Sequence, residues 1–378
     1  MGIFHEIGEA IRYFSASKKH PEITFYSESG IYYQNFRATI DELLAKSGYT
    51  LLYITSDQKD PIWEIAKKNN RLRPFFIKGL LPIIFPFIST KTVILTMSDL
   101  HNFHIKRSTN QVNHIYIFHA INSTHMVYNP RAFDHYDTIF CVGKHHTEEI
   151  RKTEEIYKLP AKTLIDVGYS WLEDLESAYK NATSIKAKSR PKILIAPSWN
   201  AQNLLESSID PILTKLLPHD FDLVLRPHPE FIKRKATLLS AIIEKYRGHH
   251  NLEIETDSAQ SSSVKEADLL ITDWSGIGFE FSFSMLKPVI YIQTPMKVHN
   301  PDYEKIGIVP LEIKIRPLAG EVVELSRVDE IDQIVIRSLQ DKERNKEQLI
   351  KLRSDHIFNW GKSGAVGADY IINYCQKK

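Results

Sequence analysis

The stretch LLITDWSGIGFEFSFSMLKPVIYI, residues 269–292, constrains the fold more than any other part of the chain. Its apolar residues predict a buried strand over 269–271 and another over 288–292, with a polar turn and a helix over 276–285 between them. Strand, turn and helix in this order are typical of a parallel sheet covered by helices. The first amides of such a helix lack partners within it and its dipole is positive at that end, so the turn can bind an anion.

Five residues of this turn and helix are candidates for binding a phosphorylated nucleotide. Ser275 and Gly276 let the backbone approach a phosphate, Thr272 and Asp273 precede them, and Glu280 can accept hydrogen bonds from ribose hydroxyls. The alternative is that Asp273 and Ser275 only cap the helix.

A second buried strand, over 222–226, runs into the sequence RPHP. Arg226 offers a planar fork for phosphate oxygens, and His228 can donate a hydrogen bond or a proton near neutral pH. The carboxyl ends of parallel strands share one edge of a sheet, so both side chains are expected near the anion-binding turn. The alternative is that Arg226 pairs with a carboxylate and His228 caps a loop.

A third strand, over 114–119, ends at His119, and small residues follow it. A histidine at this end of a strand can serve as general base toward a hydroxyl group, which typically contributes about 10²–10⁴-fold to a rate. The chain has 16 histidines, so the position of His119 carries this prediction and the residue type alone does not.

Alternating strands and helices predict an α/β protein with two doubly wound, Rossmann-like domains that face a cleft. The first domain covers 1–180 and the second 190–355, while 356–378 forms a C-terminal helix that packs back on the first domain. The segment 174–190 is the expected linker. Strands are predicted at 50–55, 92–96, 114–119, 138–142 and 163–167 in the first domain, and at 192–196, 222–226, 252–255, 268–272 and 288–292 in the second. A helix is expected over 328–356.

Composition indicates a folded enzyme of the cytoplasm. The chain has 378 residues, 43% of them hydrophobic and 25% charged, and a formal net charge of +2, which gives no basis for nucleic-acid binding. Its 2 cysteines suggest neither a disulfide framework nor a zinc site. Residues 1–17 lack the pattern of a secretory signal.

Residues 74–88, PFFIKGLLPIIFPFI, are almost all apolar. They are too few to cross a bilayer, which needs about 20 such residues. Either they form a buried strand and helix of the first sheet, or they touch the inner face of the plasma membrane as a peripheral contact.

Two other patterns are interpreted as structural. Residues 360–363, WGKS, resemble the end of a phosphate-binding loop, but no strand precedes them, so a turn between helices is expected. His145 and His146 are expected on the surface of a polar helix, and no metal site is predicted.

Several motifs in the same order resemble the CDP-glycerol glycerophosphotransferase family, which builds teichoic acids and related capsule polymers. The matching segments are His119-Ala120, Gly168-Tyr169-Ser170, Ala196-Pro197-Ser198-Trp199, Arg226-Pro227-His228-Pro229, Thr272-Asp273-Trp274-Ser275-Gly276 and Phe279-Glu280-Phe281. The chain departs from the family pattern at Ala120, Asn200, Gly276 and Glu280, where the family usually has Gly, Arg, Ser and Asp.

The resemblance implies a glycosyltransferase-B (GT-B) architecture and transfer of an alditol phosphate, most simply glycerol phosphate, from a CDP-activated donor to a hydroxyl of a lipid-linked or polysaccharide acceptor, with release of CMP. No cofactor or metal is then required. His119 acts as base, and Arg226 and His228 stabilise charge on the diphosphate. Donor binding involves Ser198, Arg226, His228, Thr272, Asp273, Ser275, Gly276 and Glu280.

Two alternatives remain open at this point. A sugar transferase of capsule or lipopolysaccharide synthesis would use the same frame with a nucleotide sugar. A non-catalytic nucleotide-binding assembly subunit would keep the frame without the reaction.

Overall fold

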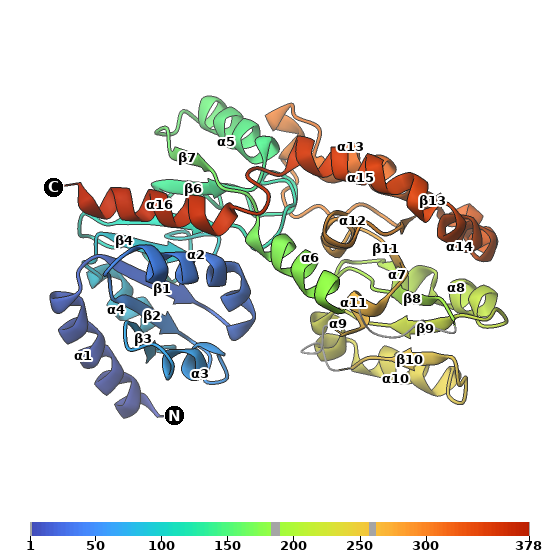
Figure 1. Ribbon diagram of the computed structural model, residues 1–378, viewed down its shortest axis with the longest axis horizontal. Coiled ribbons are helices and arrows are strands. Elements are labelled where there is room, and N and C mark those ends of the chain that lie inside the picture. Colours follow the sequence, from blue (N-terminus) through green and yellow to red (C-terminus); the bar gives the residue numbers. More distant parts are fainter. Residues whose placement is uncertain (1, 183–189, 257–261, 378) are drawn as a thin grey trace. The chain divides into compact units, whose positions relative to one another are not determined.

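The computed structural model describes residues 2–182, 190–256 and 262–377, which form two compact units (Figure 1). Unit 1 contains residues up to Trp171 together with 300–308 and the segment from His356. Unit 2 contains Leu172–His299 and Val309–Asp355. The chain therefore crosses between the units near residue 171, earlier than the expected 180, and unit 1 also takes up a short segment from the second half.

Unit 1 is built on a parallel sheet of seven strands in the order β3-β2-β1-β4-β5-β6-β7. Its strands are β1 (Ile23–Ser27), β2 (Leu51–Thr55), β3 (Leu72–Phe76), β4 (Thr92–Leu95), β5 (Asn113–Ile117), β6 (Thr138–Cys141) and β7 (Thr163–Asp166). Its helices are α1 (Ile3–Lys19), η1 (Gly30–Tyr32), α2 (Tyr33–Lys46), α3 (Ile62–Ala66), α4 (Leu81–Ile84), η2 (Phe85–Phe87), α5 (Lys144–Tyr157), η3 (Tyr303–Ile306) and α16 (Ser363–Gln376). Helix α6 (Ser170–Ala182) begins here and continues into unit 2.

Unit 2 has a parallel sheet of six strands in the order β10-β9-β8-β11-β12-β13. Its strands are β8 (Lys192–Ile195), β9 (Asp222–Leu225), β10 (Leu252–Ile254), β11 (Leu269–Thr272), β12 (Val289–Gln293) and β13 (Glu321–Glu324). Its helices are α7 (Leu204–Ser207), α8 (Ile209–Leu216), α9 (Pro229–Arg234), α10 (Ala236–Lys245), α11 (Ser262–Glu266), α12 (Ile277–Met285), α13 (Leu311–Ala319), η4 (Leu325–Glu330), α14 (Ile331–Gln340) and α15 (Lys342–His356).

Each sheet has its own apolar core, which holds the carboxyl ends of the strands in place. In unit 1 the strands pack with α2 and α16, so the C-terminal helix is part of this core. A Cβ on Gly364 would lie 2.7 Å from the Cβ of Ala38, which shows how closely α16 and α2 approach. In unit 2 the strands pack with α8, α10 and α14.

Two expectations about helices were wrong. Much of the expected linker is helix α6, because Leu172 and Leu175 are buried on one side of it; residues 183–189 lie outside the described part. The single helix expected over 328–356 is divided into η4, α14 and α15, with a break at Asp341. Residues 359–362 do form a turn between two helices, as predicted.

Segment 74–88 is largely a buried part of unit 1. Its residues form the end of β3, then α4 and η2, and Phe75, Leu81 and Phe85 are buried. Ile83 and Phe87 are 63% and 61% exposed. The buried alternative thus describes most of the segment, and two apolar side chains remain at the surface. No helix among the described residues is long and apolar enough to cross a membrane.

Candidate active site

In unit 1, His119 follows β5 and lines a cleft of about 390 Å³. Residues from the carboxyl ends of β1, β4 and β5 and from the loop after β4 surround it, as expected for a parallel sheet. The lining residues are Glu28, Tyr32, Thr96, Met97, Ser98, Asp99, Phe103, His104, Ile105 and His119.

The hydrogen bonds of His119 fix which of its nitrogens carries a proton. Its Nδ1 lies 3.2 Å from the backbone oxygen of Thr96, which can only accept, so Nδ1 donates and Nε2 keeps a lone pair. Loss of hydration lowers the pKa of His119, so the neutral ring prevails at pH 7. The ring is further placed by Tyr32 and Tyr128, whose ring centroids lie 5.3 and 6.0 Å away. This arrangement suits a general base.

The loop that follows His119 is held from beneath by three buried side chains of α5. His145 and His146 donate from Nε2 to the backbone oxygens of Ile121 and Asn122 at 2.8 and 2.9 Å. Glu149 accepts from the hydroxyl of Thr124 at 2.7 Å. Burial lowers the pKa of both histidines to about 3, so they stay neutral. The expectation that they lie on the surface was wrong: the carbonyl groups of a distant loop cover them.

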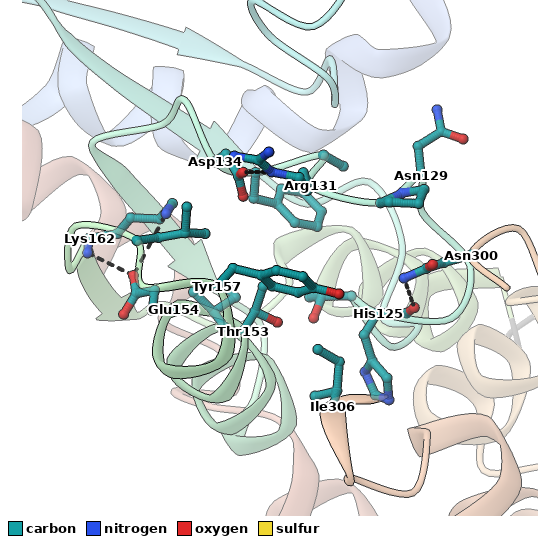
Figure 2. Close-up of a pocket in the computed structure, with 16 residues that line it drawn as sticks. His125, Asn129, Arg131, Asp134, Thr153, Glu154, Tyr157, Lys162, Asn300 and Ile306 are labelled. Carbon is teal, nitrogen blue, oxygen red and sulfur yellow. Dashed lines mark hydrogen bonds and ion pairs between the residues drawn. The ribbon is translucent and has the colours of Figure 1, made fainter. Parts of the chain in front are cut away.

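A second, smaller cavity of about 40 Å³ lies between this loop, α5 and the segment 300–306 (Figure 2). A hydrogen bond and an ion pair join residues that line it. Asn300 donates to the backbone oxygen of His125 at 2.9 Å, and Arg131 pairs with Asp134 at 2.5 Å. A space of this size holds about one water molecule, so it is a packing cavity and not a substrate site.

In unit 2, Asp273 ties together two loops at the carboxyl ends of β8 and β11. Its carboxylate oxygens accept from the amides of Ser198 at 2.7 Å and Leu204 at 3.0 Å, and its side chain is fully buried. The hydroxyl of Thr272 donates to the oxygen of Ala196 at 2.6 Å. Donor binding by Thr272 and Asp273 stays a prediction, and the contacts that the structure shows for both are with the backbone of these loops.

Other candidates lie on the same two loops and on α12. The hydroxyl of Ser198 is buried and has no hydrogen-bond partner in the described part of the chain. Ser275 and Gly276 precede α12, whose first backbone bonds run from the amides of Gly278 and Phe279 back to their oxygens. Glu280 is half-buried in the first turn of the helix. Ser275 and Gly276 thus lie in the turn before a helix, where the sequence predicts an anion-binding site.

Arg226 and His228 follow the neighbouring strand β9. The Nε of Arg226 lies 3.8 Å from Glu255, so the carboxylate pairing held open as an alternative does occur. His228 caps α9, because its Nδ1 accepts from the amide of Glu230 at 3.1 Å. Since Nδ1 is an acceptor, the hydrogen of the neutral ring is on Nε2. Loss of hydration, followed by the charge of Lys297, lowers the pKa of His228 to about 4.

Two cationic residues near these loops were missed by sequence reasoning. Lys297 acts electrostatically on both His228 and Asp273. Arg316 stacks over Trp274, with 3.8 Å from its central carbon to the ring centroid, and donates to Gln293 at 3.0 Å. Both are distant in sequence from the motifs, and no local pattern marks them. They add positive charge beside a turn suited to phosphate.

The residues described by the structure contain no group of three or more His, Cys, Asp or Glu side chains placed to hold a metal ion.

Comparison with known proteins decides the family. Residues 10–305 match the family model described as CDP-Glycerol:Poly(glycerophosphate) glycerophosphotransferase. The chain belongs to this family. It is an enzyme family whose name implies a CDP-glycerol donor and a poly(glycerophosphate) acceptor.

Individual relatives agree with this assignment. The chain is 28% identical over 170 residues to a teichoic acid glycerol-phosphate primase from Bacillus spizizenii, a stretch that covers 42% of this chain and 41% of that protein. The wall teichoic acid polymerase TagF superposes with a TM-score of 0.58 at 13% identity, over 100% of this chain and 99% of that structure. UDP-GlcNAc 2-epimerase from Neisseria meningitidis superposes with a TM-score of 0.58 at 13% identity, over 93% of this chain and 99% of that structure. Both structures show a GT-B-like fold, which the two parallel sheets confirm for this chain.

Proposed function

We propose that the protein transfers glycerol phosphate from CDP-glycerol to a hydroxyl group of a lipid-linked or polysaccharide acceptor of the cell envelope, with release of CMP. Unit 1 binds the acceptor and unit 2 binds the donor. The observation that carries the proposal is the opposite hydrogen bonding of two neutral histidines. His119 has its Nδ1 hydrogen on a carbonyl and offers a lone pair, whereas His228 has its Nδ1 on an amide and offers a hydrogen.

The proposed reaction is a single displacement at phosphorus. The acceptor oxygen attacks the β-phosphorus of CDP-glycerol, and its proton passes to Nε2 of His119. The bond between the β-phosphorus and the bridging oxygen breaks, and CMP leaves with that oxygen. His228 donates from Nε2 to a diphosphate oxygen, while Arg226 and Lys297 supply positive charge. Ser198, Ser275 and the amide of Gly276 hold further oxygens, and Glu280 holds the ribose.

We propose that this chemistry needs no metal ion, because the positive charge and hydrogen-bond donors of unit 2 can stabilise the leaving group. CMP release in the presence of excess EDTA tests the point. Activity that is lost with EDTA and restored by Mg²⁺ would contradict it.

We also propose that unit 1 touches the membrane peripherally, on the cytoplasmic side, through segment 74–88 together with α1. Ile83 and Phe87 are exposed on the former, and Phe4 and Ile11 are 85% and 66% exposed on the latter. Glu6 joins the two elements by accepting from the amides of Lys78 and Leu80, both at 3.0 Å. A lipid-linked acceptor would then meet unit 1 at the bilayer surface.

The decisive experiment measures CMP release and thermal unfolding with CDP-glycerol, CDP-ribitol, UDP-GlcNAc and CMP. Ligand at 100 times its dissociation constant should add about 2.7 kcal/mol of stability. Stabilisation by CDP-alditols with release of CMP is expected. Stabilisation by UDP-GlcNAc alone would favour the sugar transferase, and binding without turnover would favour the non-catalytic subunit.

A further inference from the structure

The cleft beside His119 is acidic. Two carboxyl groups, those of Glu28 and Asp99, line it, and none of its described lining residues is Lys or Arg. Glu28 follows β1, a strand that the sequence did not reveal, and Asp99 lies in the loop after β4. A molecule bound in this cleft therefore lies beside two carboxyl groups.

Asp99 is held in a fixed orientation. Its Oδ2 accepts from the hydroxyl of Ser98 at 3.0 Å and from Asn129 at 3.1 Å. Its backbone is left-handed, with φ of 64°, and its amide donates to Ala132. Loss of hydration in the cleft, and then the charge of Asp99, raise the pKa of Glu28. The two groups thus interact, and a phosphate in the cleft would be repelled by the charge of Asp99 and, whenever it is ionised, by that of Glu28.

Other groups of the cleft suit an uncharged, hydroxyl-rich molecule. The hydroxyl of Thr96 is buried, with the residue only 1% exposed, and has no hydrogen-bond partner among the described residues. Such a group normally has a partner, and a ligand hydroxyl can provide one. Tyr32 and Phe103 offer aromatic faces, and Phe103 is 62% exposed. Carboxylates, a hydroxyl and aromatic rings together suit a sugar or another polyol.

We propose that the unit of the acceptor that enters this cleft is an uncharged sugar or polyol, whose hydroxyls donate to Glu28 and Asp99, and that an end bearing phosphate binds poorly. This inference rests on the proposed transfer reaction. It implies that the protein adds glycerol phosphate to a neutral saccharide end rather than extending a chain whose end already carries phosphate.

The test compares two synthetic acceptors that differ in one group. One is an octyl disaccharide, and the other is the same compound with a single glycerol phosphate on its terminal sugar. We expect kcat/KM for the neutral compound to be at least about tenfold higher at low ionic strength, and the ratio to fall in about 0.5 M salt because screening weakens the repulsion. A preference for the charged compound would overturn the proposal.

A charge-removing variant isolates the cleft from other causes of selectivity. Glu28→Gln with Asp99→Asn should raise the relative kcat/KM of the charged acceptor about tenfold. The matched control, Glu64→Gln with Asp369→Asn, removes two charges whose side chains are 75% and 57% exposed, and should leave the ratio unchanged. An unchanged ratio in the cleft variant would also overturn the proposal.

The test of the acceptor cleft can fail while the proposed function holds, because donor binding is measured independently. Stabilisation by CDP-glycerol reports the donor site alone. If neither acceptor reacts, saturation-transfer NMR on protein saturated with CMP compares their binding directly. Equal binding of the two compounds, or binding of neither, would refute the assignment of the cleft even where CDP-glycerol binds.

Discussion

Lowering the pH from 7 to 5 should destabilise unit 1 through the two histidines beneath the loop that follows His119. His145 and His146 are 8% and 0% exposed, and burial holds the pKa of each at about 3. Titratable groups near His145 include His146, Glu149 and His356, whereas the ring centroid of His146 lies 3.8 Å from that of Phe118. In the unfolded chain both rings regain the ordinary pKa of about 6.5.

The sign follows from proton binding. Between pH 6.5 and 3 the unfolded chain binds protons at these two sites and the folded chain does not, so stability falls as the pH falls. Each histidine lowers the free energy of unfolding by about 1.36 kcal/mol per pH unit below 6.5, which amounts to about 2 kcal/mol at pH 5. Together the two histidines lower the free energy of unfolding by about 4 kcal/mol, a large part of the 5–15 kcal/mol typical of a folded protein.

Urea unfolding of the wild type and of His146→Gln at pH 7 and pH 5 measures this effect. His146→Gln is expected to be less stable than the wild type at both pH values. Its loss of stability between pH 7 and pH 5, however, should be about 2 kcal/mol smaller than that of the wild type. The control is His249→Gln, which removes an exposed imidazole in unit 2 and should show the wild-type pH dependence. If the units unfold separately, the affected transition must be that of unit 1. An equal pH dependence in His146→Gln and the wild type would refute the argument.

Three further predictions concern the site and the membrane. His119→Ala should lower CMP release by at least about 10²-fold while stabilisation by CMP persists, since the base is lost but the donor site is not; loss of both would argue against a base. Asp273→Asn leaves one of two backbone amides without its acceptor and should cost about 1–3 kcal/mol in urea unfolding, with weaker stabilisation by CMP; unchanged nucleotide binding would contradict the loop-shaping role. Phe4→Ser with Ile11→Ser should reduce flotation with anionic vesicles, whereas Ile350→Ser, on α15, should not; equal flotation of all three proteins would rule out α1 as the contact.

The sequence predicted most strands of both sheets but not β1, β3 and β13 as separate strands. Strand β3 contains Pro74 and an exposed Arg73, which its position at the edge of the sheet tolerates. Strand β13, EVVE, lies at the edge of the other sheet and is short and polar. Both are identifiable only once their neighbours are in place, because pairing and burial on one side override the local composition.

The candidate site was predictable where its residues follow strands, and unpredictable where they act through distant contacts. His119 and His228 follow β5 and β9, so the predicted strands located them, whereas Ser198, which follows β8, was located by its resemblance to a family motif. The tautomers of the histidines depend on the oxygen of Thr96 and the amide of Glu230, and Lys297 comes from the loop after β12. No spacing rule contains that information, since it arises from three-dimensional placement.

The role of each candidate histidine depends on a firmly held backbone contact. A neutral imidazole has one donor and one acceptor, and its chemical role depends on which nitrogen a fixed backbone group takes. In unit 1 the backbone of Thr96 makes that choice for His119. In unit 2 the first turn of α9 makes the opposite choice for His228. A loop that moved enough to exchange these contacts would convert a base into a donor, or a donor into a base, without any change of net charge. The buried carboxylate of Glu149, which accepts from the backbone amide of Thr124 in the loop after His119, is placed where it opposes that movement in unit 1.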